Sequence, residues 1–230
     1  MARQRVPFTL ATDSIPRITI TTSNTALLVQ DVQNYYVDPE SGLGKVAKER
    51  GIYYEFDEYF RQLSFVTENI IILLKSIHSF GFPVIFTVCS FNNHFGASKL
   101  QKAIGMKVSA TDYDAAISKM IEPSDDELII SKPGFGAFQG TNLEEYLKQN
   151  GIENLIVTGV ITEFGIRNTV FVAQDLGFRP LVISDGVASL SFETQQRAIQ
   201  ELSFGLIKVR SMGEVIQHIN FLQEDDVVLL

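Results

Sequence analysis

Six short apolar runs recur along the 230-residue chain, with helical segments between them. The runs cover residues 26–29, 84–88, 127–130, 155–158, 181–184 and 206–209. Each run is continuously apolar instead of alternating with polar residues, which is typical of strands buried on both faces of a sheet. Because parallel strands need crossovers and the interleaved helices supply them, we predict an α/β fold, a three-layer α/β/α sandwich with six parallel strands. The length fits one domain, residues 1–230, with residues 1–24 as an N-terminal extension.

Helix signals lie between these runs. Apolar residues spaced by three and four from Phe60 to Ile77 predict a long helix that ends at Gly81. Residues 141–144, Thr-Asn-Leu-Glu, form a capping-box pattern, which predicts a helix that Gly151 closes. Both helices therefore lie between consecutive predicted strands, as crossovers must.

The remaining segments are harder to assign. A further helix is predicted to begin at Ser191 or Thr194 and to end at Gly205. Residues 38–52, rich in glycine and charge, and residues 92–113, which hold three lysines, show no clear periodicity. Both stretches follow predicted strands at the carboxyl edge of the sheet, where loops of open α/β sheets form binding crevices. Whether residues 38–52 form a lid stays open at this point.

The composition excludes several classes of protein. A formal net charge of −8 and a pI near 4.9 disfavour a nucleic-acid-binding surface, which depends on clustered lysine and arginine. No apolar run reaches the roughly 18 residues that a membrane-spanning helix needs. Residues 1–16 lack the apolar stretch of a secretory signal, so we expect a cytoplasmic protein without a membrane partner.

The sulfur and imidazole side chains offer little for metal binding. Cys89 is the single cysteine, so no intramolecular disulfide and no cysteine-based zinc site can form. The three histidines, His78, His94 and His218, are scattered along the chain. We predict no catalytic metal.

Two charged residues follow predicted strands directly. Asp31 comes after the first run and Lys132 after the third. Taken singly, Asp31 could equally be a turn residue, and Lys132 could equally be a solvated lysine. Because carboxyl ends of parallel strands meet at one edge, together they suggest a carboxylate and an ammonium facing one crevice, an arrangement suited to general acid–base work.

The fourth run continues into a strand-to-helix turn, residues 158–169. The backbone N–H groups of such a turn point into the crevice and can hold an oxyanion. A serine or cysteine there could be a nucleophile, but this turn contains neither.

Four segments in register resemble the isochorismatase-like hydrolases. They are Ala26-Leu-Leu-Val-Gln-Asp-Val-Gln-Asn34, Lys132-Pro-Gly-Phe-Gly-Ala-Phe-Gln-Gly-Thr-Asn-Leu143, Ile156-Val-Thr-Gly-Val-Ile-Thr-Glu-Phe-Gly165 and Asp175-Leu-Gly-Phe-Arg-Pro-Leu-Val-Ile-Ser-Asp-Gly-Val-Ala-Ser189. The resemblance covers roughly Thr25 to Val215. It implies a Rossmann-like sandwich, a homodimer or homotetramer, and, in most members, amide hydrolysis by an Asp, a Lys and a Cys.

Asp31 and Lys132 match the first two positions of that triad, and the third is Gly165. Without a thiol at position 165 the thioester route is closed. The resemblance implies an isochorismatase, since these members carry glycine there. Cleavage of a vinyl ether needs only an acid and a positioned water: the acid protonates the methylene carbon and water adds to the oxocarbenium ion.

The predicted catalytic residues are therefore Asp31, Lys132 and Gly165. Asp31 is the general acid, with a pKa raised by burial, and Lys132 orients Asp31 or a substrate carboxylate. Gly165 leaves room that a side chain would fill. The predicted substrate-binding residues are Gln33, Cys89, Lys99, Phe135, Phe138, Ile161, Thr162 and Phe164.

Some side chains keep two interpretations. Cys89 is either a small buried hydrophobe at a strand end or a nucleophile relocated to another wall of the crevice. Arg167 and Glu163 flank the missing nucleophile, and a helix-surface ion pair explains both, although Arg167 could also reach an anionic substrate.

Three functions follow from these observations. The first is a cofactor-independent hydrolase that cleaves a small anionic metabolite, isochorismate, to pyruvate and 2,3-dihydro-2,3-dihydroxybenzoate. The second is an amidase or imidase of the same fold that uses activated water or Cys89. The third is a non-catalytic member that binds a metabolite or protein, against which the presence of both Asp31 and Lys132 argues.

Overall fold

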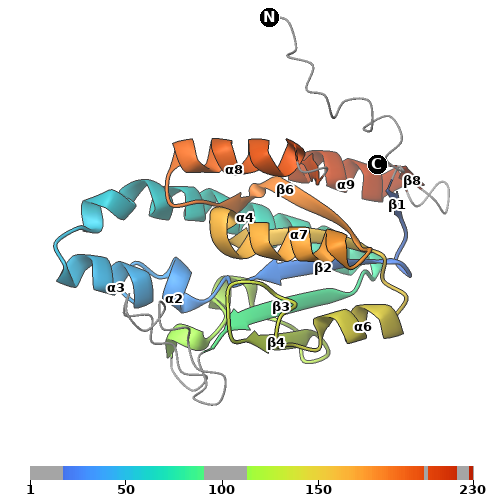
Figure 1. Ribbon diagram of the computed structural model, residues 1–230, viewed down its shortest axis with the longest axis horizontal. Coiled ribbons are helices and arrows are strands. Elements are labelled where there is room, and N and C mark those ends of the chain that lie inside the picture. Colours follow the sequence, from blue (N-terminus) through green and yellow to red (C-terminus); the bar gives the residue numbers. More distant parts are fainter. Residues whose placement is uncertain (1–17, 91–112, 205–206, 222–227, 230) are drawn as a thin grey trace, which may run out of the picture.

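The computed structural model describes residues 18–90, 113–204, 207–221 and 228–229. Six strands form one parallel sheet in the order β4-β3-β2-β5-β6-β7 (Figure 1). They are β2 (Thr25–Gln30), β3 (Val84–Cys89), β4 (Leu128–Lys132), β5 (Asn154–Val160), β6 (Arg179–Ala188) and β7 (Lys208–Arg210). A separate antiparallel pair joins β1 (Thr19–Ile20) to β8 (Val228–Leu229). The predicted α/β fold with six parallel strands is confirmed.

Numbered along the chain, the six parallel strands follow the Rossmann order 3-2-1-4-5-6. The order reverses between β2 and β5, which are paired in register from Thr25↔Asn154 to Gln30↔Gly159. In open sheets of this kind ligands bind outside the carboxyl ends of the strands at this reversal. The segments after Gln30 and Val160 therefore lie where a site is expected.

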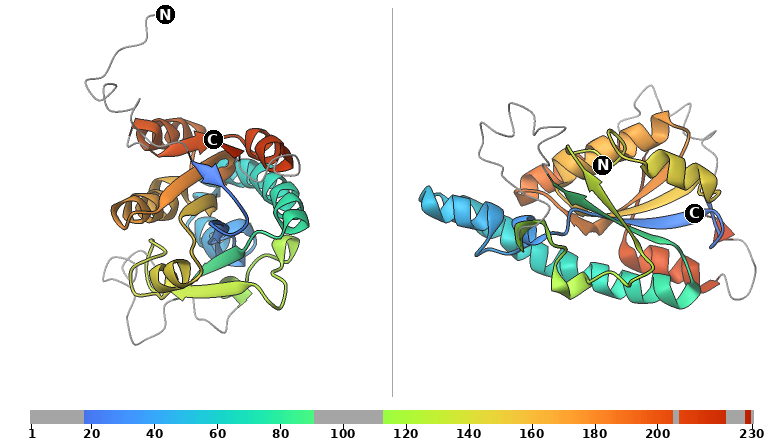
Figure 2. Two further views of the ribbon diagram at one scale, coloured as in Figure 1. Left: turned by 90° about the vertical axis from the view of Figure 1, so that its right-hand side faces the viewer. Right: turned by 90° about the horizontal axis from the view of Figure 1, so that it is seen from below.

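Helices and single helical turns are the other elements of the described residues. They are α2 (Asn34–Val37), α3 (Gly42–Glu49), η1 (Tyr53–Phe56), α4 (Asp57–Phe80), η2 (Tyr113–Ala115), η3 (Lys119–Ile121), α6 (Leu143–Gln149), the π-helical turn η4 (Thr162–Ile166), α7 (Arg167–Asp175), α8 (Phe192–Phe204) and α9 (Met212–Phe221). Helices α4 and α9 cover one face of the sheet, and α6, α7 and α8 cover the other (Figure 2). The sheet is thus buried on both sides, which explains why its strands read as continuous apolar runs.

Helix α4 confirms the periodicity of its sequence. Leu63, Ile70 and Ile77 are buried against the sheet, and Gly81 ends the helix with a left-handed φ of 75°. Among the described residues, one helical stretch, Tyr53–Phe80, is long and apolar enough to cross a membrane by length and composition. The buried face of this helix packs into the domain core, so we interpret the stretch as a core helix of the domain.

Two local expectations need correction. Residues 38–52 contain the helix α3, so this stretch is not structureless. Helix α6 forms as predicted, but not with a capping box, because Glu144 pairs with Lys148 and Asn142 makes no side-chain cap bond. The Thr141 hydroxyl instead accepts a hydrogen bond from the Leu143 N–H at 3.3 Å.

Candidate active site

Asp31 and Lys132 meet at the carboxyl edge of the sheet. Lys132 ends β4 and Asp31 follows β2, two strands away, and Lys132 Nζ lies 2.7 Å from Asp31 Oδ2. Lys132 is 0% exposed and Asp31 is 3% exposed. A buried charge must be paired and hydrogen-bonded to be tolerated, and this pair meets that condition.

The ammonium group of Lys132 has no proton left for a ligand. Besides its contact with Asp31, Nζ donates to the carbonyl oxygens of Gly134 at 2.7 Å and Phe135 at 2.8 Å. A lysine has three donors, so these contacts account for all of them. Of the two roles predicted for Lys132, the geometry favours orienting Asp31 over binding a substrate carboxylate.

Asp31 is held in an unusual backbone conformation. Its φ is +56°, in the left-handed region that residues other than glycine rarely adopt. The Thr87 hydroxyl donates to its Oδ1 at 3.1 Å. Burial raises the pKa of the Asp31 carboxyl, and the charge of Lys132 and hydrogen bonds from Lys132, Thr87 and Gln30 lower it without reversing the shift. An acid with a raised pKa and a strained backbone is a recurrent sign of a functional site.

Gln30 is the site residue that the sequence analysis missed. Its side chain is fully buried, and Nε2 donates to the Phe135 carbonyl oxygen at 3.1 Å. Its Oε1 accepts from the Thr169 hydroxyl at 2.7 Å. These contacts join residues 105 and 139 positions apart, so no local pattern could reveal them. We refer to Gln30, Asp31, Thr87 and Lys132 as the polar cluster.

Gly165 lies in η4, immediately after β5, and is buried. The prediction that it leaves empty room is wrong. A Cβ at this position would lie 2.4 Å from Gln30 Nε2, so the Gln30 amide already occupies the space.

A cavity of about 370 Å³ is linked to the polar cluster through Phe135, which lines it and whose carbonyl oxygen accepts from Lys132 and Gln30. We call it the apolar cavity, and it is lined by Tyr35, Tyr36, Leu43, Val46, Ala47, Arg50, Ile52, Phe56, Phe135, Ile161, Phe164 and Leu190. Three predicted substrate-binding residues, Phe135, Ile161 and Phe164, are among them, and the rings of Phe135 and Phe164 stack at 5.7 Å. The volume suits a small metabolite. Arg50 is the charged residue of this lining, and the sequence analysis did not single it out.

Four described residues that were predicted to bind substrate do not line the apolar cavity. Three of them, Phe138, Thr162 and Gln33, contact other parts of the protein instead. Phe138 stacks on Phe178 at 5.9 Å within the core beneath α6 and α7. The Thr162 hydroxyl donates to Gln195 at 2.8 Å. Gln33 is buried and is used up by backbone contacts, donating to the Cys89 carbonyl and accepting from the Cys89 N–H. A further predicted contact, Lys99, lies outside the described residues.

Cys89 is the fourth of these residues. Its side chain is fully buried, and burial raises the pKa of the thiol to about 11. Sγ lies 3.8 Å from the Gly134 carbonyl oxygen. Because the thiolate is the nucleophilic form, this environment favours the structural interpretation of Cys89.

The residues flanking Gly165 do not pair with each other. Arg167 lies 3.3 Å from Glu201 on the surface, and Glu163 accepts a hydrogen bond from the Leu190 N–H at 3.2 Å. Arg167 therefore forms the expected surface ion pair, and its partner is Glu201.

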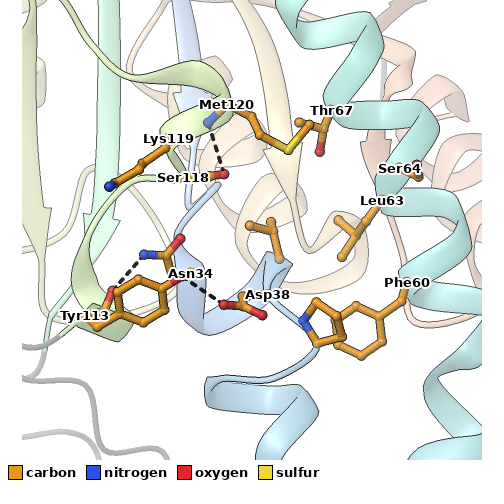
Figure 3. A pocket seen from close by; sticks show the side chains of 12 residues that line it. Asn34, Asp38, Phe60, Leu63, Ser64, Thr67, Tyr113, Ser118, Lys119 and Met120 are labelled. Carbon is orange, nitrogen blue, oxygen red and sulfur yellow. Dashed lines mark hydrogen bonds between the residues drawn. The ribbon is translucent and has the colours of Figure 1, made fainter.

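A second cavity, of about 380 Å³, lies between α2, α4 and the turns η2 and η3 (Figure 3). Its polar groups are largely paired within the protein: Tyr113 donates to Asp38 at 2.9 Å, and Asn34 donates to the Tyr113 carbonyl at 3.0 Å. In the part of the chain that the structure describes, no three His, Cys, Asp or Glu side chains gather as metal ligands would. The polar cluster with the apolar cavity is therefore the candidate active site.

Comparison with known proteins identifies the family of the chain. The Isochorismatase domain family matches residues 25–218. The chain belongs to the isochorismatase family. The isochorismatase of Bacillus subtilis (strain 168) is 27% identical over 176 residues, which cover 76% of this chain and 51% of that protein. The N-carbamoylsarcosine amidase of Arthrobacter sp is 32% identical over 157 residues, covering 64% of this chain and 59% of that protein.

The curated relatives thus include both an isochorismatase and an amidase. The chain spans only 51% and 59% of the lengths of these two curated relatives. Among solved structures, a cysteine hydrolase from Pseudomonas syringae pv. phaseolicola 1448A has a TM-score of 0.76 at 18% identity, covering 90% of this chain and 97% of that chain. This likeness shows that the two chains share a fold.

Proposed function

We propose that this protein hydrolyses the vinyl ether of isochorismate, giving pyruvate and 2,3-dihydro-2,3-dihydroxybenzoate, without a covalent enzyme intermediate. The observation that carries the proposal is a buried acid beside a position without a nucleophile. Asp31 has a pKa raised by burial, and the space at Gly165 is taken by the Gln30 amide. Such a site can donate a proton but cannot form a thioester at residue 165.

In the proposed reaction, Asp31 transfers its proton to the methylene carbon of the enol ether. The π electrons form the new C–H bond, and the positive charge is shared by the ether carbon and its oxygen. Water then adds to that carbon and returns a proton to the Asp31 carboxylate. The hemiketal collapses: the bond between the former enol carbon and the ether oxygen breaks, the hemiketal hydroxyl gives up its proton to become the carbonyl of pyruvate, and the oxygen that stays on the ring takes up a proton as an alcohol.

In this proposal the two cations, Lys132 and Arg50, have separate roles. Lys132, 2.7 Å from Asp31, stabilises the carboxylate that remains after proton transfer. Arg50, in the lining of the apolar cavity, binds a carboxylate of the substrate. The aromatic walls formed by Phe135 and Phe164 contact the ring of the substrate.

The test is pyruvate release from isochorismate, coupled to lactate dehydrogenase, by the wild type, by Asp31→Asn and by a chelator-treated sample. Asp31→Asn keeps an acceptor for Lys132 but cannot donate the proton, so the rate should fall by about 10²-fold or more. Asp175→Asn, on the exposed end of α7, is the matched control and should retain full activity. Melting curves show whether each variant is folded.

Either of two results would refute the proposal: pyruvate release that survives in folded Asp31→Asn, or no pyruvate above background from the wild type. Loss of activity on chelation would contradict the predicted absence of a catalytic metal. The cytoplasmic location and the homo-oligomeric state stay predictions.

A second candidate is hydrolysis of a small amide or imide by water that Asp31 activates as a base. The 32% identity to N-carbamoylsarcosine amidase over 157 residues favours it. Ammonia release from small amides, with no pyruvate from isochorismate, would select this function. Sensitivity to thiol alkylation would add Cys89 to it, and the absence of both products would leave a binding role.

A further inference from the structure

The orientation of the Gln30 side chain is determined by its neighbours. The Thr169 oxygen accepts a hydrogen bond from the Ala137 N–H at 2.9 Å, so its own proton is available to donate. It donates to Gln30 at 2.7 Å, and the recipient must therefore be the oxygen, Oε1. The nitrogen, Nε2, is consequently the atom that faces Gly165.

Nε2 also connects Gly165 to the acid. It donates to the Phe135 carbonyl oxygen, which accepts from Lys132 as well. Gln30 directly precedes Asp31 in the chain, and its side chain lowers the pKa of the Asp31 carboxyl. Gln30 thus lies next to the acid, shares an acceptor with the lysine and fills the space beside residue 165.

The backbone at Gly165 does not itself demand glycine. Its φ lies outside the left-handed region, in contrast to Gly159 and Gly177. The atoms nearest to a Cβ there would be Gln30 Nε2 at 2.4 Å, the Phe135 oxygen at 3.2 Å and the Val160 oxygen at 3.5 Å. The one approach under 3.0 Å involves the tip of a side chain, so a Cβ at residue 165 requires the Gln30 amide to shift.

We infer that Gln30 and Gly165 act as a coupled pair: the Gln30 amide occupies the place of a nucleophile-bearing side chain and positions Asp31 as a proton donor. Gln30 is a positioning residue, because no reacting atom is required to touch it. The inference rests on the proposed function for its catalytic meaning. It specifies a substrate class whose bond is cleaved by protonation and water, since residue 165 cannot carry a nucleophile while glutamine occupies position 30.

The first test measures stability and needs no substrate. Gly165→Cys should lower the melting temperature by roughly 5 °C or more, because the new side chain overlaps Nε2. Adding Gln30→Ala should restore much of that loss, although Gln30→Ala alone destabilises by leaving a cavity. The same cycle with Gly165→Ala covers the case in which Gly165→Cys alone does not fold.

Gly213→Cys is the matched control. No atom lies within 4 Å of a Cβ at Gly213, in α9, so this variant should melt close to the wild type, with or without Gln30→Ala. In the folded Gln30→Ala, Gly165→Cys double variant, iodoacetamide should alkylate the thiol introduced at position 165 at least tenfold faster than Cys89, as resolved by peptide mass.

The second test examines positioning. Gln30→Met keeps the side-chain length but removes the amide, so the Asp31 carboxyl loses a hydrogen bond that lowers its pKa. Carboxyl-carbon NMR should therefore place the pKa of Asp31 higher in Gln30→Met than in the wild type. A role in packing alone would leave this pKa unchanged.

The inference is overturned if Gln30→Ala rescues neither Gly165→Cys nor Gly165→Ala. It is also overturned if the Asp31 pKa is the same in Gln30→Met as in the wild type. Neither readout depends on isochorismate, so failure of the proposed reaction would leave both interpretable. Rescue, a reactive introduced thiol and a raised pKa would together establish the coupled pair even if the natural substrate proves to be an amide.

Discussion

The polar cluster and the apolar cavity share Phe135, which lines the cavity and whose carbonyl oxygen accepts from Lys132 and Gln30, and they are built in opposite ways. Gln30 and Thr87 belong to strands paired on both sides, Lys132 ends the edge strand β4, and all three are at most 1% exposed. The apolar cavity is lined by residues of α2, α3 and η1 and of loops after β4 and β5. Strands paired on both sides hold atoms rigidly, whereas helices and loops vary in position with fewer consequences for the sheet. We therefore expect the strands to determine the chemistry of the candidate site, and the surrounding helices and loops to determine which substrate enters it.

The largest expected effect comes from breaking the polar cluster. Lys132→Met leaves Asp31 without its cation and the Gly134 carbonyl without its lysine donor, which should cost about 3–5 kcal/mol of unfolding free energy. The rate of pyruvate release should fall by about 10²-fold or more. Urea unfolding and the coupled assay measure the two effects.

Lys148→Met is the control for that substitution. Lys148 forms an exposed pair with Glu144 on α6, so its loss should cost at most about 0.5 kcal/mol. Equal destabilisation by the two substitutions would contradict the view that the buried pair is distinctive.

The pH dependence of the rate sharpens the assignment of Asp31 as the acid. An acid must carry its proton, so kcat/KM should be highest below the raised pKa of Asp31 and fall about tenfold per pH unit above it. A rate that rises with pH through the same range would instead identify Asp31 as a base, as the amidase alternative requires.

Stability should follow the same sign. The unfolded chain releases the Asp31 proton above about pH 4, while the folded chain retains it up to its raised pKa. The contribution of Asp31 is therefore fully present below about pH 4 and is lost as the pH rises through the folded-state pKa. Urea midpoints against pH should show this decline in the wild type and in Asp175→Asn, but not in Asp31→Asn.

A smaller effect is expected from the apolar cavity. Arg50→Met should raise KM roughly tenfold with little change in kcat, because in the proposed reaction the arginine of the cavity lining binds the substrate carboxylate before and during the reaction. Lys45→Met, on the exposed side of the same helical segment, is the control and should leave KM unchanged. A fall in kcat with unchanged KM would move Arg50 from binding to catalysis.

The smallest effect is expected at Cys89. Cys89→Ala removes a buried thiol whose pKa is about 11, so activity should stay within about twofold of the wild type. Steady-state kinetics measures this. Complete loss of activity in a folded Cys89→Ala variant would support the interpretation of Cys89 as a relocated nucleophile.

Much of the fold could be predicted because its signals are local. The apolar run in β5 and the periodicity of α4 each lie within one stretch of sequence, and both elements form. Asp31 and Lys132 could be brought together because the edge at which parallel strands end is a consequence of topology. The helix α3 escaped notice because its glycines and charges mask the weak apolar face.

The details of the site could not be predicted in the same way. Phe135 and Phe138 lie in one loop and look equivalent in the sequence, yet Phe135 lines the apolar cavity and Phe138 packs on Phe178. Gln33 resembles a polar crevice residue, but its amide is used up by the backbone of Cys89. A loop side chain can face either way, and only the packed neighbours determine that direction.

By itself, the sequence determined the parallel sheet, the edge at which Asp31 and Lys132 meet, and the absence of a serine or cysteine at position 165. Only the tertiary structure decided why that position is glycine. The Gln30 amide reaches it from a neighbouring strand, 135 positions earlier in the chain. The periodicity of a segment indicates which of its faces is buried in the fold. The free volume beside a residue depends instead on side chains from distant segments, and these come together only when the chain folds.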